Sequence, residues 1–107
     1  MSLVGRYSCH ELGAVLTITE ANDSNGRGRG RFAMGGMTIP INLHYHFENS
    51  DGPRTNLIIW DTNTDPNQYV GGAGVSDTPY ADEGVHLAGG LSVLGKTAGF
   101  SCFFKKG

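Results

Sequence analysis

Three arginines alternate with glycines between residues 26 and 31 and form the strongest local charge feature of the chain. Arg27, Arg29 and Arg31 are separated by single glycines, and residues two apart share one face of a strand. A strand here would carry three guanidiniums on one face, and guanidiniums make bidentate contacts with planar anions. The pattern predicts either a cradle for an anionic ligand, such as a phosphate backbone or an acidic glycan, or a solvated face that protects a sheet edge.

Two histidines, His44 and His46, share a strand face, and two imidazoles at this spacing can reach one metal ion. His10 and His86 lie on other segments and could join them only through the fold. No acidic or cysteine ligand is fixed beside the pair by its spacing. We therefore expect no metal site, and we expect both imidazoles to face water.

The positions of these side chains depend on an alternation of apolar and polar residues. Between residues 37 and 47 the alternation has no exception, which predicts a strand with one buried face. Turn-forming residues, such as those at 23–26 and 62–67, separate shorter segments of the same kind, so consecutive strands should pair antiparallel. Closing the sheet would remove its edges. We expect one all-β domain over residues 1–107, an eight-stranded antiparallel up-and-down β-barrel with strands near 5–11, 14–21, 27–34, 37–47, 55–61, 67–76, 84–94 and 97–104.

Pro40 lies within the longest of these segments and has no N–H to donate to a neighbouring strand. Proline inside a sheet is confined to edges and bulges. We therefore expect a bulge or break near Pro40, or an open barrel with Pro40 on its edge.

Length and composition limit the class of protein. The 107 residues suffice for one core, and 17 glycines are too many for ordinary helices but suit turns and bent strands. The net charge of -2 and the pI near 6.0 argue against a general affinity for nucleic acid, and no apolar run is long enough to cross a membrane. Signatures of a nucleophile elbow, a phosphate loop or a zinc-protease helix are absent, so we expect a non-enzymatic binding protein without a cofactor.

The two cysteines carry information about the chain topology. Cys9 lies on the first expected strand and Cys102 on the last, and these strands are neighbours in a closed eight-stranded meander. A disulfide would join the chain ends and suggest a secreted or periplasmic protein, whereas two buried free thiols would fit a cytoplasmic one. The sequence leaves both alternatives open.

Three segments resemble the avidin and streptavidin family in order and approximate spacing. They are Gly5 to Thr19, the strand Leu57 to Asn63 that contains Trp60, and the hexapeptide Gln68 to Ala73. The resemblance implies an eight-stranded up-and-down barrel, usually a tetramer, with a small-molecule pocket in one barrel mouth.

The resemblance also implies which residues line that mouth. Trp60 matches a family tryptophan that packs against the ligand, whereas His10 and Ala14 stand where the family has polar groups for biotin. Each hydrogen-bonding group left unpaired costs about 1 to 3 kcal/mol, so we expect biotin to bind weakly or not at all. A different small molecule is expected in a site formed by Trp60, Phe32, His10, Ala14, Asn63 and Ser101.

The same resemblance assigns residues to the two barrel faces. It places inside Ala14, Leu16, Ile18, Phe32, Ile58 and Trp60, and outside Cys9, Arg27, Arg29, Arg31, Leu57, Ile59 and Cys102. The segment from Leu57 to Trp60 is apolar on both faces, which a monomeric barrel with a wet exterior does not need. We therefore expect a homo-oligomer, either a dimer or a tetramer.

Two functions follow from these expectations. The first is a barrel that binds a small ligand other than biotin at its mouth. The second is a lectin-like or protein-binding module that uses its loops and the stripe of Arg27, Arg29 and Arg31 on a barrel scaffold. A filled barrel interior would favour the second.

Overall fold

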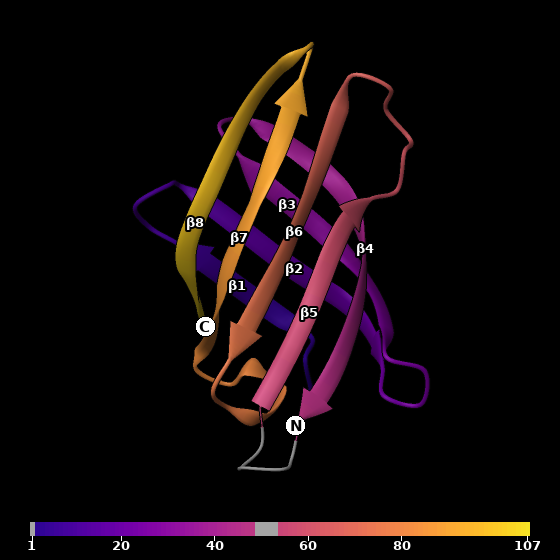
Figure 1. The fold of residues 1–107 in the computed structure, drawn as a ribbon, viewed down its shortest axis with the longest axis vertical. Coiled ribbons are helices and arrows are strands. Elements are labelled where there is room, and N and C mark those ends of the chain that lie inside the picture. Colours follow the sequence, from indigo (N-terminus) through magenta and orange to yellow (C-terminus); the bar gives the residue numbers. More distant parts are fainter. Residues whose placement is uncertain (1, 49–53) are drawn as a thin grey trace.

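Eight antiparallel strands close into a barrel, as the alternation predicts (Figure 1). The computed structural model describes residues 2–48 and 54–107. Its elements are β1 (Gly5–Cys9), β2 (Ala14–Asn22), β3 (Arg27–Met34), β4 (Met37–Glu48), β5 (Arg54–Asp61), β6 (Gln68–Ser76), the short 3-10 helix η1 (Pro79–Ala81), β7 (Gly84–Val93) and β8 (Lys96–Lys106). Among the described residues, no helix is long and apolar enough to cross a membrane.

The barrel closes at a short seam between β1 and β8. Only Tyr7–Lys106 and Ser8–Lys105 pair there, whereas β7 and β8 pair from Gly84 to Val93. Beyond the paired residues the seam is held by the Cys9–Cys102 disulfide, whose Cα atoms are 6.4 Å apart. The covalent bond therefore continues the closure where the β1–β8 pairing ends.

The expected outward orientation of the two cysteines is wrong. Cys9 pairs with buried Ala14, and Cys102 pairs with buried Leu87, so both sulfurs lie on the inner side of the wall. Partners directly across a ladder point to the same face of a sheet. The disulfide is consequently part of the core.

No bulge forms at Pro40, and the expected break is found only in the pairing of β4 with β5. The register between β3 and β4 runs without a shift through the Arg31–Pro40 pair. On the other side of β4 the ladder with β5 begins only at Ile41–Asp61, and the Pro40 carbonyl accepts a hydrogen bond from Thr62 N–H at 3.0 Å. Pro40 therefore lies where β5 has ended, and the barrel stays closed around it.

Side chains fill the barrel interior. One end of the barrel carries the β1–β2, β3–β4, β5–β6 and β7–β8 connections. Toward this end the rings of Phe32 and Phe100 stack with their centroids 5.2 Å apart, and the centroid of the Phe104 ring lies 6.2 Å from that of Phe32. Toward the other end Tyr7 is fully buried and donates a hydrogen bond to the Leu3 carbonyl at 2.6 Å. The remaining core is aliphatic and includes Leu16, Ile18, Ile39, Ile41, Leu43, Leu57, Ile59, Val70, Val85, Leu87 and Leu91.

The face assignment is confirmed for β2 and β3 and is wrong for β5. Ala14, Leu16, Ile18 and Phe32 are buried, as expected, and the three arginines are exposed. On β5, however, Leu57 and Ile59 are buried, whereas Ile58 and Trp60 are 48% and 42% exposed. Side chains alternate between the two faces of a strand. Arg54 and Asn56 face water, so Ile58 and Trp60, which lie two and four residues beyond Asn56, face water as well.

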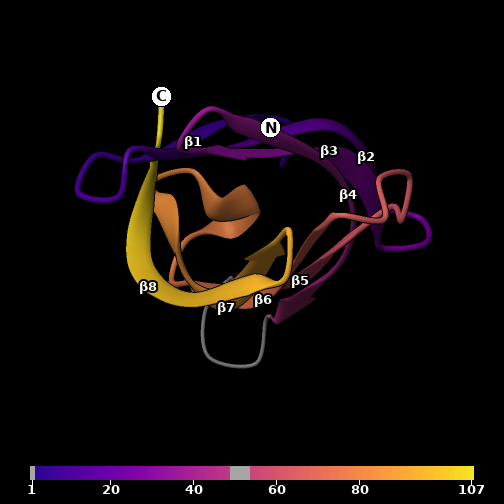
Figure 2. The same ribbon diagram turned by 90° about the horizontal axis from the view of Figure 1, so that it is seen from above.

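The barrel is flattened into two walls. Its principal extents are 42, 28 and 20 Å, and the view along the barrel shows β1–β3 facing β6–β7 across the narrow direction (Figure 2). Each wall thus offers a comparatively flat outer surface.

Candidate functional site

The residues expected at the barrel mouth do not come together. Phe32 and Ala14 are buried in the core, while Trp60 and Ser101 lie on the outer side of the barrel. His10 and Asn63 are exposed and lie in the turns after β1 and β5. The space that a mouth ligand would need is occupied by the stacked Phe32–Phe100 pair and by Leu91.

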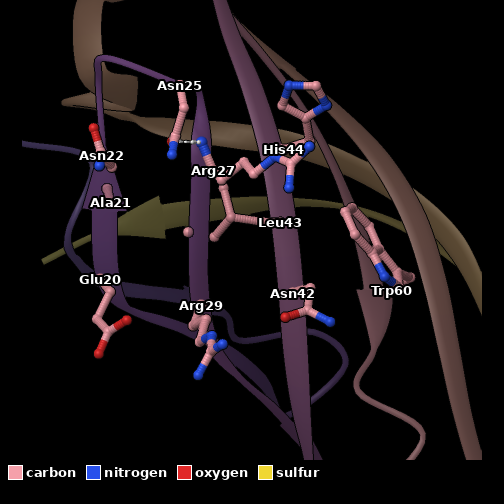
Figure 3. Close-up of a pocket in the computed structure, with 11 residues that line it drawn as sticks. Glu20, Ala21, Asn22, Asn25, Arg27, Arg29, Asn42, Leu43, His44 and Trp60 are labelled. Atoms are coloured by element: carbon pink, nitrogen blue, oxygen red, sulfur yellow. Dashed lines mark hydrogen bonds between the residues drawn. The ribbon is translucent and has the colours of Figure 1, made fainter.

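A groove of about 520 Å³ lies instead on the outer face of β2–β5 (Figure 3). It contains Trp60 together with two arginines of the stripe, so it joins two features that the sequence singled out. Its lining residues are Glu20, Ala21, Asn22, Asn25, Arg27, Gly28, Arg29, Asn42, Leu43, His44 and Trp60.

Strand pairing orders these side chains in two parallel rows. One row runs across the strands through Glu20, Arg29, Asn42 and Trp60. The second runs through Asn22, Arg27, His44 and Ile58. Neighbouring strands are about 4.8 Å apart, so each row is roughly 14 Å long, and the two rows are separated by about 7 Å along the strands.

A β-bulge in β2 determines which residues enter the first row. The register with β3 shifts between Ile18, which faces the core, and Glu20, which pairs with Arg29. The inserted residue, Thr19, donates from its hydroxyl to the Arg29 carbonyl at 3.2 Å. The bulge therefore keeps Glu20 on the outer side opposite Arg29, in line with the tendency of bulges to re-aim side chains.

Positive charge at the groove is not neutralised within the described chain. Among residues 2–48 and 54–107, no carboxylate lies within ion-pairing distance of the Arg27, Arg29 or Arg31 guanidinium. The side chain of Arg27 extends across β4 toward His44 (Figure 3). Exposed guanidiniums that form no ion pair with the described residues remain available to an external anion.

Two asparagines of the groove present donors. Asn22 Oδ1 accepts from the Ser24 N–H at 2.9 Å, and Asn25 Oδ1 accepts from the Arg27 N–H at 3.0 Å. These bonds use the amide oxygens, so the NH₂ groups are still available as donors. The groove is thus rich in donors, with Glu20 as its one carboxylate acceptor.

The histidine pair has the expected exposure. His44 and His46 both face water on β4, and His46 Nε2 lies 3.7 Å from a carboxylate oxygen of Glu48. Within the described residues, no three His, Cys, Asp or Glu side chains gather in a metal-binding cluster. His44 belongs to the groove, whereas His46 lies outside its lining.

Sequence reasoning missed Glu20, Asn22, Asn25 and Asn42 as neighbours of the arginines. The turn at 23–26 contained the signal for part of this set, because a hairpin closed there pairs Asn22 with Arg27. The bulge at Thr19 has no comparable sequence signal, so the position of Glu20 opposite Arg29 could not be predicted.

Comparison of the chain with known proteins found no matching family model, no matching curated protein and no matching solved structure. The resemblance to avidin and streptavidin therefore rests on the sequence segments themselves.

Proposed function

We propose that this chain is a non-enzymatic, lectin-like recognition protein that binds an acidic saccharide on the outer wall of its barrel. The observation that carries the proposal is the groove on β2–β5, in which Trp60 stands in one strand-crossing row with Arg29 and two side chains that can hydrogen-bond hydroxyls, Asn42 and Glu20. A ligand at the barrel mouth has less support, because core side chains fill the interior.

The chemistry of the groove favours a sugar that carries an acid group. The indole of Trp60 offers a flat apolar face for a sugar ring, in the way that binding sites combine aromatic surface with a few polar groups. The guanidiniums of Arg27 and Arg29 suit a carboxylate or sulfate, and the asparagine amides suit hydroxyl oxygens. Glu20 accepts hydrogen bonds from hydroxyls and disfavours ligands of high negative charge density.

Nucleic acid is the less suitable polyanion. Its backbone requires extended neutralisation by many cations, whereas this chain has a net charge of -2 and places Glu20 inside the groove. Two arginines beside one tryptophan match a ligand with few, separated charges.

A matched ligand pair tests the proposal. Trp60 fluorescence should respond to sialyllactose, trigalacturonate or a short sulfated oligosaccharide, and respond less to lactose and maltotriose, which lack the acid group. Arg29→Glu should weaken binding of the acidic ligand about 10- to 100-fold, since a charge-assisted contact contributes about 1.5 to 3 kcal/mol.

Arg6→Glu is the matched control, because Arg6 is an exposed arginine on β1, outside the groove. It makes the same change of net charge and should leave the affinity nearly unchanged. Equal losses in the two variants, or equal binding of lactose and sialyllactose to the native protein, would refute a specific acidic-saccharide site.

A further inference from the structure

A second cavity, of about 460 Å³, lies beside the groove at the end of the barrel where β4 extends past β3. The pairing of β3 with β4 ends at Arg27–His44, whereas β4 continues to Glu48. The turn before β3 adds one backbone hydrogen bond, from the Tyr45 N–H to the Gly26 carbonyl at 2.7 Å. The edge of β4 beyond this bond has no β3 partner. The cavity lies along that edge, between residues 23–26 of the turn and residues 44–47 of β4.

A carboxylate, that of Asp23, is held in a fixed position beside this cavity. The Asn22 side chain accepts a hydrogen bond from the Ser24 N–H at 2.9 Å, and the Asn22 carbonyl accepts one from the Gly26 N–H at 2.9 Å, so the turn is locked. The Tyr45 hydroxyl donates to Asp23 Oδ1 at 2.6 Å. Within residues 2–48 and 54–107, Asp23 forms no ion pair. A phenol that donates a hydrogen bond orients a carboxylate without cancelling its charge.

Aromatic rings lie next to this negative charge. The centroid of the Phe47 ring is 5.4 Å from that of Tyr45 and 4.7 Å from that of Tyr80. Tyr45 and Phe47 line the cavity, and Tyr80 packs against Phe47 from outside the described lining. The charge of Asp23 raises the pKa of Tyr80, so this phenol also lies near the carboxylate. Three rings and one carboxylate therefore gather at this end of the barrel, and both kinds of group attract cations.

The other groups of the cavity select among cations. Within the described residues no three His, Cys, Asp or Glu side chains could hold a metal ion together. A primary ammonium presents three donors, but acceptors are few here, because Asn25 Oδ1 already accepts from the Arg27 N–H at 3.0 Å. An alkylated ammonium needs no hydrogen-bond acceptor and is stabilised by a nearby carboxylate together with aromatic faces. The described lining includes no Lys or Arg side chain that would repel it.

We propose that this second cavity binds a small organic cation with an alkylated ammonium group, held by the Asp23 carboxylate and the rings of Tyr45 and Phe47. The guanidiniums of the groove do not line the second cavity, although Asn25 and His44 border both. The two sites therefore differ in the charge that they select, and the cation site does not depend on saccharide binding.

Choline and tert-butylethanol, its neutral carbon analogue, test the proposal as a matched pair, because the two molecules have nearly the same shape and only choline is charged. In NMR titrations of the native protein the N-methyl signal of choline should shift upfield, as protons above aromatic faces do. Choline should bind at least about 5-fold more tightly than the alcohol. Equal affinities of the two molecules, or no binding of choline, overturn the proposal.

Two variants separate the contributions of charge and rings. Asp23→Asn keeps an oxygen for the Tyr45 hydroxyl and removes the charge, so it should weaken choline binding about 5-fold or more. Glu11→Gln is the matched control, because Glu11 is an exposed carboxylate in the turn after β1, at the other end of the barrel. Phe47→Leu keeps an apolar side chain and should weaken choline binding about 2- to 5-fold.

Unchanged choline affinity in Asp23→Asn or in Phe47→Leu overturns the proposal, and so does an equal loss in Glu11→Gln. Arg29→Glu separates this site from the saccharide groove, since it should lower saccharide affinity and should not weaken choline binding.

Discussion

At the scale of single residues, Gly89 and Gly90 are neighbours on β7 that face opposite sides of the wall. A Cβ at Gly89 would lie 2.7 Å from the Gly72 Cα and would collide with the Gly71 carbonyl, whereas a Cβ at Gly90 would have its nearest neighbour, the Ala98 carbonyl oxygen, at 3.5 Å. Glycine is therefore required at position 89 by the close approach of β6, whereas position 90 has room for a side chain among the described residues.

This pair predicts opposite effects of one substitution. Gly89→Ala should lower the free energy of unfolding by about 1 to 3 kcal/mol, because a methyl group is forced against backbone. Gly90→Ala should leave it unchanged or raise it by about 0.5 to 1 kcal/mol, because alanine restricts the unfolded chain. Urea denaturation at low protein concentration measures both, and equal losses would contradict the assigned faces.

Buried phenols make the fold sensitive to alkaline pH. Burial raises the pKa of Tyr7 and of Tyr45, and the hydrogen bond that the Tyr45 hydroxyl donates to Asp23 at 2.6 Å raises the pKa of Tyr45 further. The folded protein keeps these phenols protonated, whereas the unfolded chain releases the protons at its ordinary pKa of about 10. The stabilisation is thus fully present below pH 10 and is lost as the pH rises above it.

We expect the urea midpoint to fall as the pH rises above about 10. Tyr45→Phe should lose less of its stability over this interval than the native protein, because it removes one of the phenols that resist ionisation. If the urea midpoints of the two proteins depend on pH in the same way, Tyr45 does not contribute to the loss of stability at alkaline pH.

At the scale of elements, the eight strands could be predicted closely and their local irregularities could not. Alternation and turn residues locate β4 and the hairpin turns because both signals are local.

The sequence of β5 also indicated which of its faces is exposed, since Arg54 and Asn56 fall on the same side as Ile58 and Trp60. The resemblance to the avidin and streptavidin family placed Trp60 inside the barrel, which is the opposite face. The bulge at Thr19 and the unbroken pairing of Pro40 with β3 depend on neighbouring strands, so no single segment predicts them.

The β1–β8 seam is the element whose stability depends most on the disulfide. The Cys9–Cys102 bond closes a loop of 93 residues, and in the chain-entropy model such a loop contributes about 4 to 5 kcal/mol. A Cys9→Ala, Cys102→Ala double variant should lose about this much free energy of unfolding, and its β1 amides should exchange faster than those of β6. A loss below about 1 kcal/mol would mean that the two ladder pairs and the core suffice to close the barrel.

At the scale of the whole molecule, the flattened barrel separates two surfaces of different chemistry. The groove on β2–β5 is polar and carries guanidiniums that form no ion pair with the described residues, while the outer wall of β6–β8 carries no Asp, Glu, Lys or Arg from Tyr69 to Val75, His86 to Ser92 and Thr97 to Phe103. Barrel class could be predicted from the sequence, because a chain composed of amphipathic strands must remove its edges. The groove could not, because it requires the register of four strands at once. Its arginines and its tryptophan were each noticed separately, but their meeting on one outer face depends on the fold.

The most direct test of outer-wall recognition compares two sites for one ligand. Binding of an acidic saccharide should weaken about 10- to 100-fold in Arg29→Glu, which alters the groove, and should be retained in a His10→Ala, Asn63→Ala double variant, which alters exposed turns at the barrel mouth. Titration calorimetry of the native protein and the two variants measures this. Loss of binding in the double variant with full affinity in Arg29→Glu would place the ligand at the mouth and contradict the outer-wall site.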